Sequence, residues 1–107
     1  MTKSQFEKEV KNKIELLIKY IGEVQNIPNY RDDIECQDYF TMVNNTIRKM
    51  RKTISNCTSL PDADFKNLDF NKIFADIEYG MEAPKSCLDH IKSKGCLEKR
   101  PQSYFSN

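Results

Sequence analysis

The chain has 107 residues, of which 31% are charged, and its formal net charge is +1 at pH 7. This length predicts a single domain with a modest core, and the near-neutral charge argues against nucleic-acid binding through a general positive field. No apolar run approaches the roughly 18 residues that a membrane span needs, so we expect neither a nucleic-acid nor a membrane partner.

The first helix is predicted over residues 2–25. Ser4 and Glu7 have the spacing of a capping box at its start. Apolar residues then recur every three or four positions, as in a helix with one buried face: Phe6, Val10, Ile14, Leu17, Ile21 and Val24. Three more apolar residues are expected to widen this face: Leu16, Ile18 and Tyr20. Pro28, among asparagines, predicts the end of the helix.

The second helix is predicted within residues 29–57 and is expected to organise the fold. Its apolar stripe is unbroken: Cys36, Phe40, Val43, Ile47, Met50, Ile54 and Cys57. Acidic residues in the first turns and basic residues in the later turns complement the helix macrodipole. The two cysteines at the ends of the stripe lie about 30 Å apart in a continuous helix. They are therefore too far apart to bond to each other.

Two further helices are predicted, over residues 64–80 and 84–95. Gly80 suits the C-terminal cap of the former, and Pro84 suits the first turn of the latter. The predicted fold is all-α, a small disulfide-linked bundle of about four helices in up-down-up-down order. It forms a single domain over residues 1–107.

The C-terminal residues 97–107 are polar apart from three residues, Leu97, Tyr104 and Phe105. We expect this segment to be either a loose tail or one that its two aromatic residues dock onto the bundle.

Four cysteines in a chain of this size favour two disulfides over free thiols or a metal site. The cysteines form no C-x-x-C pair, and the chain has one histidine, whereas zinc sites usually show short ligand spacings. We therefore expect no metal and a secreted protein. Two N-x-S/T sequons, at Asn44 and Asn56, agree with this location.

The pairing of the cysteines follows from the predicted topology. In an up-down-up-down bundle the second and fourth helices run in the same direction, so their beginnings meet at one end and their ends at the other. This predicts the disulfides Cys36–Cys87 and Cys57–Cys96. Cys87 and Cys96 lie about 13 Å apart along a helix and do not easily pair with each other.

The sequence offers little for catalysis. His90 is the single histidine, and its neighbour Asp89 does not face it on a helix. No G-x-S-x-G, H-E-x-x-H or P-loop motif is present. We therefore expect no enzyme activity and no cofactor.

One charge cluster is the candidate partner-binding site. Its members are basic: Arg48, Lys49, Arg51 and Lys52, joined by Lys92 and Lys94 if the Cys57–Cys96 pairing holds. An acidic pole is expected at the other end of the bundle: Asp32, Asp33, Glu35, Glu78 and Glu82. The basic pole would dock an acidic protein surface or a sulfated polysaccharide. The simpler interpretation is dipole complementation together with solubility.

The aromatic residues leave a further choice open. A helical shell could enclose a pocket for an apolar ligand, or these side chains could simply fill the core. Close packing of protein interiors favours the filled core.

The whole chain resembles the small salivary anti-haemostatic proteins of anopheline mosquitoes, the group of anophensin, hamadarin and albicin. Four features carry the resemblance: the Lys/Glu-rich first helix, the segment 30–36, the basic run leading to Cys57, and the closing Cys87 and Cys96. The resemblance implies a secreted, non-enzymatic inhibitor of a host plasma cascade. Members are linked with contact activation and kinin release, and albicin-like members with the alternative pathway of complement.

The sequence is therefore expected to encode an inhibitor that binds host plasma proteins, first the convertase of the alternative complement pathway and next the contact/kallikrein-kinin coagulation pathway. One alternative is a secreted apolar-ligand carrier resembling an odorant-binding protein, although the C-x3-C pair of that class is missing. Another is a short-chain helical cytokine, although its long crossover loops are not evident.

Overall fold

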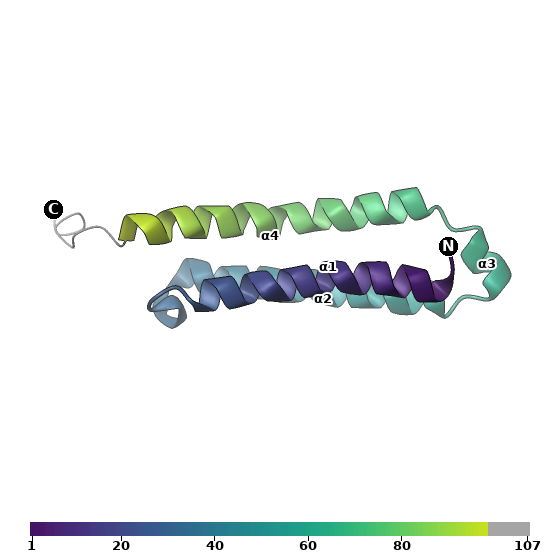
Figure 1. Cartoon of the computed structure of the whole chain (residues 1–107), viewed down its shortest axis with the longest axis horizontal. Coiled ribbons are helices and arrows are strands. Elements are labelled where there is room, and N and C mark those ends of the chain that lie inside the picture. Colours follow the sequence, from purple (N-terminus) through teal and green to yellow (C-terminus); the bar gives the residue numbers. More distant parts are fainter. Residues whose placement is uncertain (99–107) are drawn as a thin grey trace.

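The computed structural model describes the backbone of residues 1–98 and the side chains of residues 1–93. Three long helices run side by side along the molecule (Figure 1): α1 (Lys3–Gln25), α2 (Ile34–Thr58) and α4 (Phe70–Glu98). Two short helices lie in the connections: the 3-10 helix η1 (Tyr30–Asp32) and α3 (Asp62–Lys66). No strand occurs in residues 1–98, so the all-α prediction is confirmed for this part of the chain.

The apolar stripe of α1 is buried as predicted except for Ile21, which is half-buried, but its cap and its width differ. Thr2, not Ser4, is the N-cap, and it forms a capping box with Gln5. The fully or nearly fully buried residues are Phe6, Val10, Ile14, Leu17 and Val24. Leu16 and Ile18 are 41% and 46% exposed, so the prediction that they widen the buried face is wrong. A helix that packs between only two neighbours needs no wider apolar face.

The stripe of α2 is the best predicted part of the fold. Asp33 caps the helix by accepting hydrogen bonds from the backbone N–H groups of Glu35 and Cys36. All but one of the predicted stripe residues are buried; Phe40 is half-buried, and its neighbour Tyr39 takes the fully buried place.

The second half of the chain contradicts the predicted helix boundaries. The predicted helices over residues 64–80 and 84–95 do not exist as such: α3 ends at Lys66, and α4 continues from Phe70 to Glu98. Asp69 marks the true start, because its Oδ1 accepts the N–H of Lys72 at 3.1 Å. Gly80, the expected cap, lies inside α4, and so does Pro84.

Burial explains why α4 continues through a proline. The ring of Pro84 is fully buried, and it continues the stripe of Ile77, Met81, Leu88 and Ile91 along one face of α4. The missing N–H and the ring cost a helix interior about 3 kcal/mol. Packing this whole face against α1 and α2 offsets that cost.

The direction of α4 changes the topology. The three long helices run up, down and up, so α4 is parallel to α1 and antiparallel to α2 (Figure 1). The predicted up-down-up-down order, with the second and fourth helices parallel, is therefore wrong. The premise of the Cys57–Cys96 pairing is lost with it, because Cys57 lies near the end of α2 and Cys96 near the end of α4, at opposite ends of the bundle.

Cys36 and Cys87 lie at the same end of the bundle, as predicted, but for a different reason. In antiparallel helices the beginning of α2 lies beside the end of α4, so both residues lie at the same end of the bundle. Cys36 and Cys57 are buried and Cys87 is half-buried, and the structure shows no disulfide among these three. The side chain of Cys96 lies outside the described residues. The Cys36–Cys87 bridge stays a prediction.

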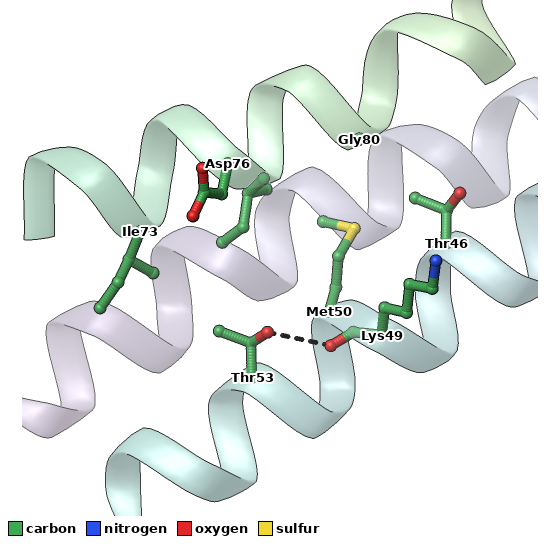
Figure 2. A pocket seen from close by; sticks show the side chains of 8 residues that line it. Thr46, Lys49, Met50, Thr53, Ile73, Asp76 and Gly80 are labelled. Atoms are coloured by element: carbon green, nitrogen blue, oxygen red, sulfur yellow. Dashed lines mark hydrogen bonds between the residues drawn. The ribbon is translucent and has the colours of Figure 1, made fainter.

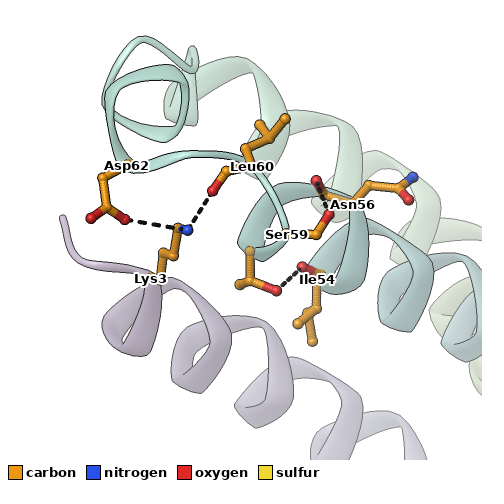
Figure 3. A network of polar contacts seen from close by, with 7 residues as sticks. Lys3, Ile54, Asn56, Ser59, Leu60 and Asp62 are labelled. Carbon is orange, nitrogen blue, oxygen red and sulfur yellow. Dashed lines mark hydrogen bonds and ion pairs between the residues drawn. The ribbon is translucent and has the colours of Figure 1, made fainter.

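The two ends of the bundle are fixed in different ways. At one end, the ring of Phe6 in α1 contacts those of Phe65, Phe70 and Phe74, with centroids 5.6–6.0 Å away. Beside it, the ammonium of Lys3 binds the carbonyl oxygen of Leu60 and the carboxylate of Asp62 (Figure 3).

The other end is held by polar contacts between helices. Lys92 Nζ lies 3.0 Å from Glu23 Oε1, and His90 Nε2 lies 3.2 Å from Glu35 Oε2.

The predicted tail falls only partly within the described residues: residues 97 and 98 belong to α4, and residues 99–107 lie outside them.

Replacing Pro84 by Ala tests the account of α4. The substitution restores an N–H donor and removes a poor helix former, at the loss of a buried ring and of rigidity in the unfolded chain. We expect the free energy of unfolding to rise by about 1–2 kcal/mol, measured by urea denaturation. A fall would show that α4 depends on the proline ring and not on helix continuity.

Candidate protein-docking surface

The four basic residues predicted on the second helix form a compact cluster in the structure. Arg48, Lys49, Arg51 and Lys52 all lie exposed on α2, and we call them the basic cluster. The chain has no acidic residue between Asp38 and Asp62, so α2 carries positive charge alone over this stretch. None of the four forms an ion pair with any residue whose side chain is described. Arg48 donates only a neutral hydrogen bond, to Asn45 Oδ1 at 3.3 Å.

The two basic residues expected to join this cluster do not do so. Lys92 lies toward the opposite end of the bundle, where it pairs with Glu23. Lys94 follows it on α4, and its side chain lies outside the described residues. The prediction failed because α4 runs antiparallel to α2, which carries its C-terminal lysines away from Arg48 and Lys52.

The predicted acidic pole is assembled only in part, because Asp32, Asp33 and Glu35 lie together around the beginning of α2, whereas Glu78 and Glu82 lie in the middle of α4. Glu35 faces His90 at the beginning of α2, as an acid paired with a possible cation. Glu78 lies midway along the bundle, where it pairs with Lys13 of α1. Opposite charges therefore mix along α4, whereas the basic cluster on α2 carries charge of one sign.

A groove borders the basic cluster between α2 and α4. Its volume is about 340 Å³. It is lined by residues from two turns of each helix (Figure 2): Thr46, Lys49, Met50, Thr53, Ile73, Asp76, Ile77 and Gly80. Sequence reasoning missed this groove, because it depends on how the side chains of residues 46–53 and 73–80 pack between two helices, which apolar spacing alone does not specify.

The chemistry of the groove is an apolar floor with one charge of each sign. Met50 and Ile77 are 3% and 7% exposed, so they belong to the core as well as to the floor. The hydroxyls of Thr46 and Thr53 donate hydrogen bonds to carbonyl oxygens of α2 at 3.0 Å, so these two donors need no partner from another molecule. Lys49 extends toward Thr46, whereas Asp76 lies on the side of Ile73 (Figure 2).

A smaller groove of about 190 Å³ lies between α1 and α4. It is lined by Leu16, Tyr20, Glu78, Met81, Glu82 and Lys85. The Lys13–Glu78 ion pair joins the same two helices. Leu16, whose burial was predicted, is an exposed wall of this groove.

A buried cluster around Tyr39 joins the three long helices. The side chain of Tyr39 is fully buried, and its hydroxyl has no hydrogen-bond partner among the described residues. Burial raises the pKa of this phenol well above its usual value, and the neighbouring Cys87 and Glu23 raise it further. Tyr39 therefore stays neutral at any physiological pH.

Cys87 is equally unsuited to act as a nucleophile. Burial raises the pKa of its thiol above the ordinary value, and the carboxylates of Glu35 and Asp38 add to this effect. A raised pKa leaves less thiolate at neutral pH, and the thiolate is the reactive form. The same carboxylate of Glu35 lies beside His90, so this residue of α2 faces two side chains of α4.

Within the described residues, no group of three or more His, Cys, Asp or Glu side chains could hold a metal ion. No described helix combines the length and the apolar character needed to cross a membrane. Comparison with protein-family models, with curated proteins and with solved structures gives no match. Function must therefore be argued from the surfaces described above.

The reactivity of Cys87 tests the electrostatics of this cluster. In Glu35→Gln the loss of a negative charge lowers the pKa of the Cys87 thiol. In the fully reduced protein, in which Cys87 is a thiol, we expect its alkylation by iodoacetamide at pH 8 to become about two- to fivefold faster. The measurement is the mass-resolved rate for the peptide that contains Cys87. Glu82→Gln, on the α1 side of α4, is the matched control and should leave this rate unchanged; equal rates in both variants would contradict the assignment.

The hydroxyl of Tyr39 gives a separate prediction. Tyr39→Phe removes a buried polar group that has no described partner, so the free energy of unfolding should stay constant or rise by up to about 1 kcal/mol. Chemical denaturation measures it, with the exposed Tyr79→Phe as control. A loss above about 1 kcal/mol would mean that the hydroxyl makes a stabilising hydrogen bond.

Proposed function

We propose that this chain is a secreted, non-enzymatic inhibitor that binds host plasma proteins through α2. The preferred target is the convertase of the alternative complement pathway, and the contact/kallikrein-kinin pathway is next. The choice of these cascades rests on the resemblance to anopheline salivary proteins. The mode of action, by protein–protein contact, rests on the basic cluster.

The single observation that carries the proposal is the position of the basic cluster on α2. A helix dipole favours cations only within about the last turn. The cluster lies earlier, and the last turn of α2 contains no basic residue at all. Dipole complementation therefore does not account for it, which leaves solubility or a partner as its reason.

The charge arrangement favours a partner. Like charges on neighbouring helix positions repel each other by a few tenths of a kcal/mol per pair, and no described acid offsets this cost. A concentrated positive surface instead attracts an acidic protein and speeds its association. A rigid helix also holds its side chains in fixed relation, which lowers the entropy lost on binding.

The short connections argue against a substrate-like inhibitory loop. The segments 26–33 and 59–69 each contain a helical turn, η1 and α3, respectively. Inhibition would thus come from covering a surface of the target rather than from occupying a protease active site. The α2–α4 groove is not an enclosed cavity, which suits a protein contact better than the enclosed pocket of an apolar-ligand carrier.

Serum assays test the proposal directly. We expect the protein to protect rabbit erythrocytes from lysis by human serum at micromolar concentration. Failing that, it should prolong kaolin-activated clotting of human plasma. Absence of both effects would refute the plasma-inhibitor function.

Charge reversal tests the surface. Arg48→Glu combined with Lys52→Glu should weaken inhibition at least about tenfold, because attraction to an acidic partner becomes repulsion. The matched control is Lys8→Glu with Lys19→Glu, two exposed lysines on α1 that make the same change in net charge. Equal losses of inhibition in both double variants would show that the effect comes from net charge. Unchanged inhibition by the Arg48/Lys52 variant would exclude the basic cluster as the binding surface.

A further inference from the structure

The α2–α4 groove has room for side chains of a further helix, with a volume of about 340 Å³. Its lining residues span positions 46–53 of α2 and 73–80 of α4, so it follows each helix for about 10 Å. In a helical bundle such a furrow between two neighbouring helices is where the side chains of a further helix insert. The hydroxyls of Thr46 and Thr53 already donate hydrogen bonds within α2. Apolar side chains can therefore enter the groove without leaving these donors unpaired.

Gly80 is the residue that keeps the groove open. A Cβ atom built at this position would meet no atom within 4 Å, and the residue lies exposed in the middle of α4. Glycine is a poor helix former, and no close packing among the described residues requires the absence of a side chain at this position. A glycine here does allow another backbone or side chain to approach α4 closely.

The charges at the edges of the groove specify the chemistry of its occupant. The α2 edge carries Lys49, beside Lys52 and Arg48, and this stretch of α2 has no acid. The α4 edge carries the single charge of Asp76. An occupant with acidic residues along the edge that faces α2 matches this pattern, whereas a basic occupant would be repelled by the basic cluster.

We propose that the partner contributes an amphipathic α-helix, apolar on one face and acidic along one edge, which docks in the α2–α4 groove. The docked helix would lie beside α2 and α4 and place its acidic edge against Lys49 and Lys52. This inference rests on the proposed function, which supplies a protein partner, and it specifies the chemistry of that partner. Helix-in-groove binding of this kind is read through apolar residues spaced as on one helix face.

A designed peptide pair is the direct probe. One 18-residue peptide carries Leu at positions 1, 5, 8 and 12 of its apolar face and Glu along one edge; the other replaces each Glu by Lys. Binding of fluorescently labelled peptide to the full chain is measured by anisotropy. The Glu peptide should bind at least about tenfold more tightly than the Lys peptide. Equal binding, or none, would overturn the proposal.

Two glycine substitutions locate the site. Gly80→Leu fills the groove with a better helix former, so α4 should remain folded while the affinity for the Glu peptide falls at least about tenfold. Gly22→Leu in α1 is the matched control, because a Cβ at Gly22 also meets no atom within 4 Å and Gly22 does not line the groove. Unchanged affinity in Gly80→Leu would overturn the proposal. Should Gly80→Leu misfold by circular dichroism, Lys49→Glu provides the surface test with the same expected loss.

The serum assays separate this inference from the proposed function. If Gly80→Leu retains full inhibition while the Arg48/Lys52 charge reversal abolishes it, the groove proposal fails and the plasma-inhibitor function stands. If the wild-type chain inhibits neither cascade but binds the Glu peptide in a Gly80-dependent way, the function fails and the groove remains a helix-docking site. A dimer in sedimentation equilibrium that Gly80→Leu dissociates would identify a second copy as the occupant and overturn the proposal.

Discussion

The packing of one face of α4 against α1 and α2 is the interaction on which the rest of this structure depends. Five buried residues at helical spacing, including Pro84, make α4 continuous over 29 residues. Continuity fixes the direction of α4, because a helix of this length has to return along the whole bundle once α3 has reversed the chain. The positions of Cys87, His90 and Lys92 all follow from that one constraint.

The same constraint decides how the surface charges are used. Two charged residues of α4 form ion pairs with α1: Lys92 pairs with Glu23, and Glu78 pairs with Lys13. His90 meets Glu35 of α2 at the same end as Lys92. These pairs are exposed, so each contributes little to stability. The basic cluster is left outside this system of pairs.

The sequence allowed α1 and α2 to be predicted closely, because an amphipathic stripe records its own period and needs no tertiary information. The prediction failed at Gly80 and Pro84. Local propensity indicated a break in the helix there, but burial of the proline ring keeps α4 continuous. The basic cluster could be found because its members are adjacent in sequence. The position of its supposed companions Lys92 and Lys94 depends on the direction of the second half of α4, and the groove beside it depends on side-chain packing between α2 and α4; no local pattern encodes either.

Gly80 and Pro84 place two poor helix formers within one turn of α4, at an intrinsic cost of roughly 4 kcal/mol relative to alanine. The packing of this chain explains only one of them. Pro84 is fully buried and belongs to the core, whereas Gly80 is exposed and touches nothing that a methyl group would displace. Because Pro84 has no N–H, it also cannot donate the usual helical hydrogen bond to the carbonyl oxygen of Gly80. A residue that weakens its helix and widens a groove beside four unneutralised cations is best understood as part of a surface shaped for a second molecule.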